Sequence, residues 1–333
     1  MKTTTIILLG ILISLGGLAA ETHRGLARAD EPTAASGIAA KYQSDRGIAK
    51  DDDVIFADDF ESWQAGGTQP PRDTWRVRKN KVSRTRAIPG TTKLGDAIGP
   101  GDNILEIACW TPGSGSQSGG MSLRLGNYDH AKQELGDGYD ELFMRYYVKF
   151  DDGYRAVRNH GGNLGGRDVT IKNAAWVGMA GIRDVSSRGY FYSGVQPRGK
   201  SGGRELEMGF YSYHLDKRGR WGENYDVRRR VVIKPGSWHC VERHMKLNSV
   251  DPKKDDPALA DGLEELWIDG QLTIRKQGVR FRRAAHLKIA FSSLDNYYHG
   301  LPKNYDQEHP IRVFFDNLVI AKKYIGPIGS KSK

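Results

Sequence analysis

Two tyrosines spaced two residues apart are the side chains of this sequence best suited to proton transfer. They lie in the run Glu-Met-Gly-Phe-Tyr-Ser-Tyr-His-Leu-Asp at positions 207–216. A β-strand alternates its side chains between two faces, so Tyr211 and Tyr213 should share a face with Glu207 while the apolar residues between them face the core. Tyrosine is also a common strand former, so a purely structural role for the pair stays open.

The chain as a whole is basic. Its 333 residues include 50 Lys and Arg against 40 Asp and Glu, which gives a formal net charge of +10 at pH 7. A basic surface attracts nucleic acid, anionic membranes or anionic polysaccharide, and net charge does not separate these partners.

The N-terminus narrows that choice. Met1-Lys2 precedes an apolar run at positions 6–18 and the small residues Ala19-Ala20, a pattern typical of a secretory signal peptide and too short to span a bilayer comfortably. We expect residues 1–20 to be this signal and the mature protein to be secreted or periplasmic. The expected partner is then an extracellular polyanion, not nucleic acid and, after cleavage, not a membrane.

Beyond the signal, the sequence predicts one β domain. Residues 21–53 read as a flexible leader, residues 54–328 as short strands separated by Gly, Pro and Asp, and residues 329–333 as a basic tail. There is no long amphipathic helix, which favours an all-β sandwich or jelly roll of two antiparallel sheets. Asp269-Gly270 between two apolar runs predicts a tight hairpin.

A second strand, at 141–150, alternates in the same way as the tyrosine run. Leu142, Met144, Tyr146 and Val148 should face the core, and the opposite face should carry further polar and aromatic side chains. From that face and from the tyrosine strand we expect four substrate-binding residues: Arg145, Tyr147, Lys149 and Glu207. The Gly-rich loop that follows contains two further candidate residues, His160 and Asn163.

These residue types fit β-elimination on a uronate polymer. That reaction needs a group that neutralises the sugar carboxylate, a base that removes the adjacent proton and an acid that protonates the leaving oxygen. A cation lowers the pKa of a nearby phenol, so tyrosine can serve as acid or as base. The candidate catalytic residues are Tyr211, Tyr213, His160 and Asn163.

Other chemistries have weaker signals. The cluster at 239–244 matches no zinc spacing, and only a weak structural calcium site, from Glu61 and Asp316, suggests itself. A glycosidase would need two opposed carboxylates, for which Glu141 and Glu207 are available. Cys109 and Cys240 could pair after export, although buried free thiols are equally ordinary in such stretches.

Taken together, the segments resemble alginate and glucuronan lyases of the polysaccharide lyase 14 and 20 type. The resemblance covers about Val54 to Pro327 and uses the following segments: 141–150 with its Gly-Gly loop, Tyr211-Ser212-Tyr213-His214, Gly236-Ser237-Trp238-His239 to Lys246-Leu247-Asn248, Glu265-Leu266-Trp267-Ile268-Asp269-Gly270, and Phe315-Asp316-Asn317-Leu318-Val319-Ile320 with Tyr324-Ile325-Gly326.

That family implies a concanavalin A-like jelly roll with a cationic concave groove and no required cofactor. It also implies a catalytic or substrate-binding role for Tyr211 and Tyr213. The sequence departs from the family at Asn163, where those lyases have a lysine.

Our leading hypothesis is therefore a secreted lyase acting on an anionic polysaccharide, which we expect to be a monomer. In it Tyr211 or Tyr213 acts as acid or base, Asn163 and Arg145 engage the carboxylate, and His160 is a candidate base. A non-catalytic, lectin-like jelly roll and a glycoside hydrolase are the alternatives.

Overall fold

The computed structural model describes most of the chain between residues 32 and 329. The described residues are 32, 36–64, 66–68, 75–78, 83–90, 98, 102–110, 117–128, 135–155, 158–171, 185, 189–199, 203–299 and 310–329. The expected signal peptide and most of the basic tail lie outside them. No helix in this described part is long and apolar enough to cross a membrane.

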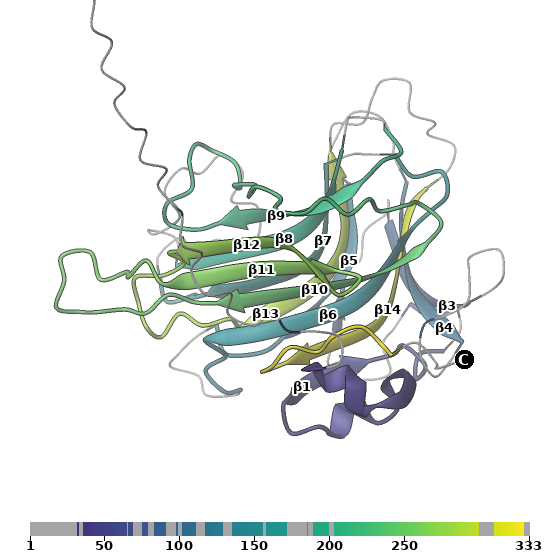
Figure 1. The fold of residues 1–333 in the computed structure, drawn as a ribbon, viewed down its shortest axis with the longest axis horizontal. Helices are drawn as coiled ribbons and strands as arrows, with labels where there is room; N and C mark the ends of the chain where they lie inside the picture. Colours follow the sequence, from purple (N-terminus) through teal and green to yellow (C-terminus); the bar gives the residue numbers. More distant parts are fainter. Residues whose placement is uncertain are drawn as a thin grey trace, which may run out of the picture. The chain divides into compact units, whose positions relative to one another are not determined.

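Two antiparallel sheets form the fold (Figure 1). The eight-stranded sheet has the order β12-β11-β10-β6-β14-β4-β3, with β1 paired to β14. Its strands are β1 Val54–Asp58, β3 Ser83–Pro89, β4 Asn103–Cys109, β6 Glu141–Phe150, β10 Trp238–Lys246, β11 Gly262–Ile268, β12 Gln271–Val279 and β14 Ile311–Ala321. The six-stranded sheet has the order β2-β5-β13-β7-β8-β9. Its strands are β2 Trp75–Val77, β5 Gln117–Arg124, β7 Arg158–Arg167, β8 Tyr190–Arg198, β9 Glu207–Tyr213 and β13 Phe291–His299.

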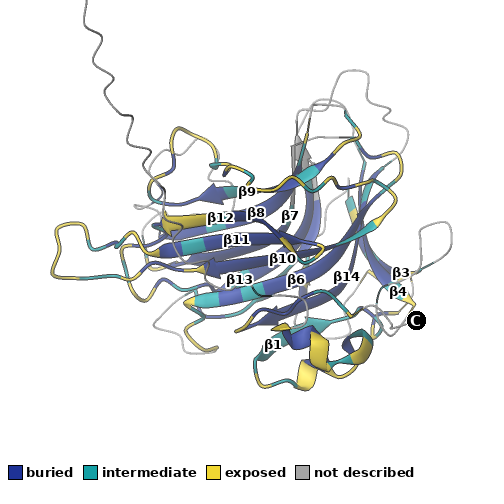
Figure 2. Cartoon of the chain, viewed as in Figure 1, coloured by how far each residue is buried: buried dark blue, intermediate teal, exposed yellow. Residues whose placement is uncertain are grey.

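The sheets pack face to face over one large apolar core. Their strands are buried along most of their length, while the connecting segments carry most of the exposed residues (Figure 2). Leu142, Met144, Tyr146 and Val148 of β6 all join this core, as their alternation predicts. The all-β sandwich expected from the sequence is confirmed.

The predicted hairpin is also present. β11 and β12 pair antiparallel with Ile268 opposite Gln271. Asp269 and Gly270 between them have φ values of +51° and +76°, the left-handed conformation that a two-residue type I′ turn requires at both positions.

The ordered domain begins earlier than the expected boundary at Val54. Residues 36–53 contain three short 3-10 helices, η2 Ile38–Lys41, η3 Gln43–Asp45 and η4 Ile48–Lys50. Ile38 and Ile48 are buried with Val319 of β14 and with Ile325 of the C-terminal segment. Burial of these apolar side chains explains why this part of the expected leader packs against the eight-stranded sheet.

The two cysteines are not bonded to each other. Cys109 and Cys240 are both buried free thiols, and the Cys109 thiol donates to the backbone carbonyl of Asn296 at 3.1 Å. The fold is therefore held by its core and its hydrogen bonds.

Candidate active site

The paired phenols lie on the outer face of the six-stranded sheet, the face that points away from the other sheet. Met208 and Phe210 of β9 enter the core between the sheets, so the alternate residues Tyr211 and Tyr213 face outward. Their hydroxyl oxygens are 3.1 Å apart, and their rings meet edge to face with centroids 5.4 Å apart. The strand therefore brings both predicted tyrosines together on one face.

The two phenols differ in their surroundings. Tyr211 is half-buried, whereas Tyr213 is only 4% exposed and packs against Val185 and Tyr190. Burial, followed by the hydrogen bond to Tyr211, raises the pKa of Tyr213 well above its ordinary value. The ammonium group of Lys217 lies 5.5 Å from the centroid of the Tyr213 ring. Tyr211 is thus the phenol more accessible to a substrate, and Tyr213 is its buried partner.

A buried polar network holds β9 in place between the two tyrosines. The Ser212 hydroxyl donates to Glu264 of β11 at 2.9 Å, and the Tyr225 hydroxyl donates to the same carboxylate oxygen at 2.8 Å. Arg243 of β10 donates to the other Glu264 oxygen at 2.8 Å. These bonds join the sheets through the core, so the position of the phenols is set by the packing of both layers.

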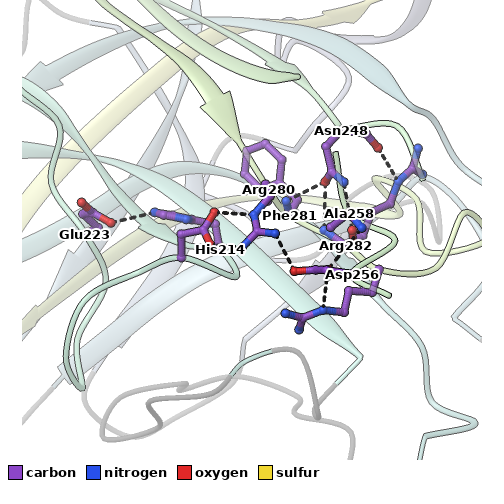
Figure 3. A network of polar contacts seen from close by, with 10 residues as sticks. His214, Glu223, Asn248, Asp256, Ala258, Arg280, Phe281 and Arg282 are labelled. Carbon is purple, nitrogen blue, oxygen red and sulfur yellow. Dashed lines mark hydrogen bonds and ion pairs between the residues drawn. The ribbon is translucent and has the colours of Figure 1, made fainter. Parts of the chain in front are cut away.

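The segment that follows β9 is fixed by polar contacts (Figure 3). His214 lies 2.9 Å from the carboxylate of Glu223, and burial lowers the pKa of its imidazole. Arg280 donates to Asp216 at 2.8 Å. It also donates to Asp256 at 2.6 Å (Figure 3). The end of the tyrosine strand is thereby tied to two loops distant in sequence.

The next strand adds phenols that the sequence analysis missed. Tyr192 of β8 lies opposite Tyr213 in the β8–β9 register, with 6.3 Å between ring centroids. Tyr190 stacks with Tyr192 at 6.5 Å. The signal was present in the sequence, because Tyr190-Phe-Tyr192 has the same two-residue spacing as the tyrosine pair of β9.

Asn163 belongs to a buried polar cluster on the same face. It is fully buried, and its side-chain oxygen accepts a hydrogen bond from the Tyr192 hydroxyl at 2.8 Å. Its amide nitrogen donates to Ser293 Oγ and to Asp295 Oδ2, both at 2.8 Å. Because both amide hydrogens are used inside the cluster, the expected role of Asn163 in binding a substrate carboxylate is not supported by this geometry.

Asp295 is the titratable member of that cluster. Burial raises its pKa to about 6, against the lowering effects of Arg78 and of the hydrogen bonds from Ser293 and Asn163. Arg78 lies 3.8 Å from Asp295 Oδ1. A Cβ at Gly120 would collide with that oxygen, so glycine at this position of β5 makes room for the carboxylate.

Three expected substrate-binding residues lie elsewhere. Arg145, Tyr147 and Lys149 project from the outer face of β6 in the other sheet and are almost fully buried. Arg145 forms an ion pair with Asp45 of the N-terminal segment, and the Tyr147 hydroxyl accepts the backbone N–H of Ile328 at 2.8 Å.

The N-terminal segment around Asp45 and the C-terminal segment around Ile328 therefore cover this face of β6. Lys149 lies over the rings of Trp238 and Phe314, at 5.1 and 5.4 Å. The expectation that Arg145, Tyr147 and Lys149 share the groove with the phenols is wrong, because the packing of these distant segments takes them out of reach of a substrate there.

Two further candidates remain with the six-stranded sheet. The backbone of His160 lies in β7 opposite Tyr297, and its side chain lies outside the described structure. Glu207 begins β9 on the same face as Tyr211 and is 3.6 Å from Arg230.

Several cations lie near residues of this outer face, although only some of them are next to the phenols. Besides Lys217 and Arg78, the guanidinium groups of Arg124 and Arg167 lie 5.0 and 5.9 Å from the centroid of the Tyr128 ring. The side chain of Arg198 lies over Gly209, a neighbour of Tyr211 in β9. A surface that carries several cations attracts an anionic polymer.

The carboxylates of the two calcium candidates, Glu61 and Asp316, accept hydrogen bonds from backbone N–H groups. Glu61 accepts the N–H of Asn103 at 2.7 Å, and Asp316 accepts those of Ile98 and Asn317 at 2.6 and 2.8 Å. Burial raises the pKa of Asp316 well above its ordinary value. Among the described residues, no group of three His, Cys, Asp or Glu side chains is arranged to hold a metal ion.

Comparison with known proteins gives the fold. No family model matches the chain, and no curated protein matches it. Among solved structures, the marine PL-14 alginate lyase from Aplysia kurodai superposes with a TM-score of 0.53 at 14% identity, covering 81% of this chain and 99% of that one. The endo-beta-1,4-glucuronan lyase from the fungus Trichoderma reesei gives 0.50 at 12% identity, covering 81% and 96%. By its fold, therefore, this chain is a β-jelly roll of the kind seen in the alginate and glucuronan lyases.

Proposed function

We propose that this protein is a polysaccharide lyase that cleaves a uronate-containing polymer by β-elimination. The observation that carries the proposal is the pair of phenol oxygens 3.1 Å apart on an outward sheet face. The fold shared with an alginate lyase and a glucuronan lyase supports it, and so do Lys217 beside Tyr213 and Arg78 beside Asp295.

In this reaction a base removes the proton on the carbon next to the sugar carboxylate. The electron pair of that C–H bond becomes a carbon–carbon double bond, the bond from the neighbouring carbon to the glycosidic oxygen breaks, and this oxygen takes up a proton. We assign the proton donation to Tyr211, the more exposed phenol. Tyr213 orients it through their hydrogen bond, and His160 remains the candidate base.

The sugar carboxylate must be neutralised before the adjacent proton becomes acidic. Since the amide of Asn163 is engaged within its own cluster, we assign this role to cations of the outer face. The candidates are Arg78, which lies beside Asp295, and Lys217, which lies beside Tyr213. We further propose that the protein is exported through residues 1–20, acts as a monomer, and needs no cofactor for the elimination.

A screen of alginate, polyglucuronate and neutral glucans tests the proposal by the ultraviolet absorbance of newly formed unsaturated ends. Tyr211→Phe should lower kcat by roughly 10² to 10⁴-fold, the range for loss of a general acid. Tyr213→Phe should lower it by up to roughly 10-fold, through loss of one hydrogen bond. Tyr42→Phe is the matched control, because that phenol bonds to Asp51 in the N-terminal segment. Full activity of a folded Tyr211→Phe variant would refute the role.

The lectin-like alternative is favoured by one observation, the internal use of both amide hydrogens of Asn163. It predicts retention on a uronate column without any new absorbance. A glycoside hydrolase is disfavoured, because Glu141 and Glu207 belong to different sheets and do not face each other.

A further inference from the structure

The loop at 217–222, with the sequence Lys-Arg-Gly-Arg-Trp-Gly, is attached to both phenols. At its start, the Lys217 ammonium lies over the Tyr213 ring and donates to the Gly219 carbonyl at 3.0 Å. At its end, Gly222 lies against the Tyr211 ring, where any Cβ would collide with the ring carbons. The Gly222 backbone also lowers the pKa of Tyr213, against the larger raising effect of burial. The position of this loop is thus set by the two phenols.

The end of the loop is also part of the sheet edge. The backbone N–H and carbonyl of Glu223 pair with those of Ser212 at 2.8 and 2.9 Å. Ser212 is the residue between the two tyrosines in β9, so the residue that follows the loop is joined to the strand at the candidate site.

Between these anchors, the loop exposes an aromatic ring between two cations. Trp221 is 58% exposed, more than any other large apolar side chain in the described structure. Arg218 and Arg220 are exposed, and neither forms an ion pair within the described residues. An exposed tryptophan far from any site would need no explanation, but this one is two residues from the strand pairing at Ser212.

This combination matches the chemistry of a uronate chain. Each sugar presents an apolar ring face that can pack on an indole and a carboxylate that a guanidinium can bind through two parallel hydrogen bonds. Trp and Arg are also the residue types that contribute most to binding when they are placed as anchors.

We propose that the loop 217–222 is a binding subsite for a uronate residue next to the cleaved bond, with Trp221 stacking on the sugar ring and Arg218 and Arg220 binding carboxylates. The proposal rests on the proposed function, because it takes the substrate to be a uronate polymer lying beside the phenols.

The test is affinity electrophoresis of the full chain in gels that contain alginate, polyglucuronate or neutral dextran, together with steady-state kinetics. Trp221→Ala should bind the retarding polymer roughly 10-fold more weakly and raise KM by a similar factor, with kcat within about twofold. Arg218→Gln with Arg220→Gln should weaken binding and flatten its salt dependence, as expected for lost charge contacts. Leu135→Ala, another exposed apolar residue, and Arg229→Gln, another exposed arginine, are the matched controls.

The outcomes separate this inference from the lyase assignment. Retardation that Trp221→Ala abolishes, without unsaturated product from the wild type, supports the subsite and overturns the lyase. Product formation with KM and mobility unchanged in Trp221→Ala overturns the subsite and leaves the lyase standing. A wild-type protein that no anionic gel retards also overturns the subsite.

Discussion

Removal of the Asp45 carboxylate should destabilise the domain through a residue one hundred positions away. Asp45→Ala leaves the Arg145 guanidinium, which is fully buried, without its ion-pair partner. Breaking a buried ion pair from one side costs about 3–5 kcal/mol, because the remaining charge stays uncompensated. That is a large part of the 5–15 kcal/mol that holds a typical domain together. The domain can limit the cost only by releasing the N-terminal segment, which would expose the buried Ile38 and Ile48.

Urea unfolding measures the total loss of free energy, and hydrogen exchange over residues 36–53 shows whether the segment has come away. The double variant Asp45→Ala with Arg145→Met removes both members of this ion pair and leaves neither charge unpaired, so it should recover most of the lost stability. A loss below about 0.5 kcal/mol in Asp45→Ala, with unchanged protection of the segment, would show that the ion pair does not hold it.

Three further predictions concern the two sheets. The raised pKa of Asp295 means that, between about pH 4 and 6, the folded state keeps a proton that the unfolded state releases. This group's stabilising contribution is therefore lost as pH rises through about 6. Relative to Asp295→Asn, urea unfolding should show the wild type losing about 2 kcal/mol between pH 4 and 6. Gly194→Ala should lower the thermal midpoint, because the new Cβ would collide with the side-chain oxygen of Asn163; an unchanged midpoint would mean that the cluster can shift. Glu264→Ala should lower the free energy of unfolding, measured in urea, by about 3–5 kcal/mol, because the buried Arg243 loses its ion-pair partner. Replacing both residues by apolar ones should restore much of this stability. Equal losses in the single and double variants would contradict this account.

The parts of the fold that the sequence predicts are those with a local pattern. The alternation in β6 and β9 identifies which side chains enter the core, because a strand repeats every two residues. The turn at Asp269-Gly270 is equally local, since both residues must adopt a positive φ. For the same reason the common face of Tyr211 and Tyr213 could be predicted without coordinates.

Alternation does not show which outward-facing residues are covered by other segments of the chain. Arg145 and Tyr147 have the pattern of solvent-facing residues, yet segments near Asp45 and Ile328 cover them. Those contacts span about one hundred residues or more, so no pattern within the strand reports them. The role of Asn163 could not be predicted either, because its partners come from β8 and β13.

The N-terminal and C-terminal segments of the domain hold each other as well as the sheet. The backbone N–H groups of Ile38 and Ala39 donate to the carbonyls of Tyr324 and Ile325 at 3.0 and 2.8 Å, and the N–H groups of Ile325 and Gly326 donate in turn to the buried Glu242, both at 2.7 Å. Any shortened form of the protein should therefore retain residues 36–53, since removing them would uncover the buried Arg145.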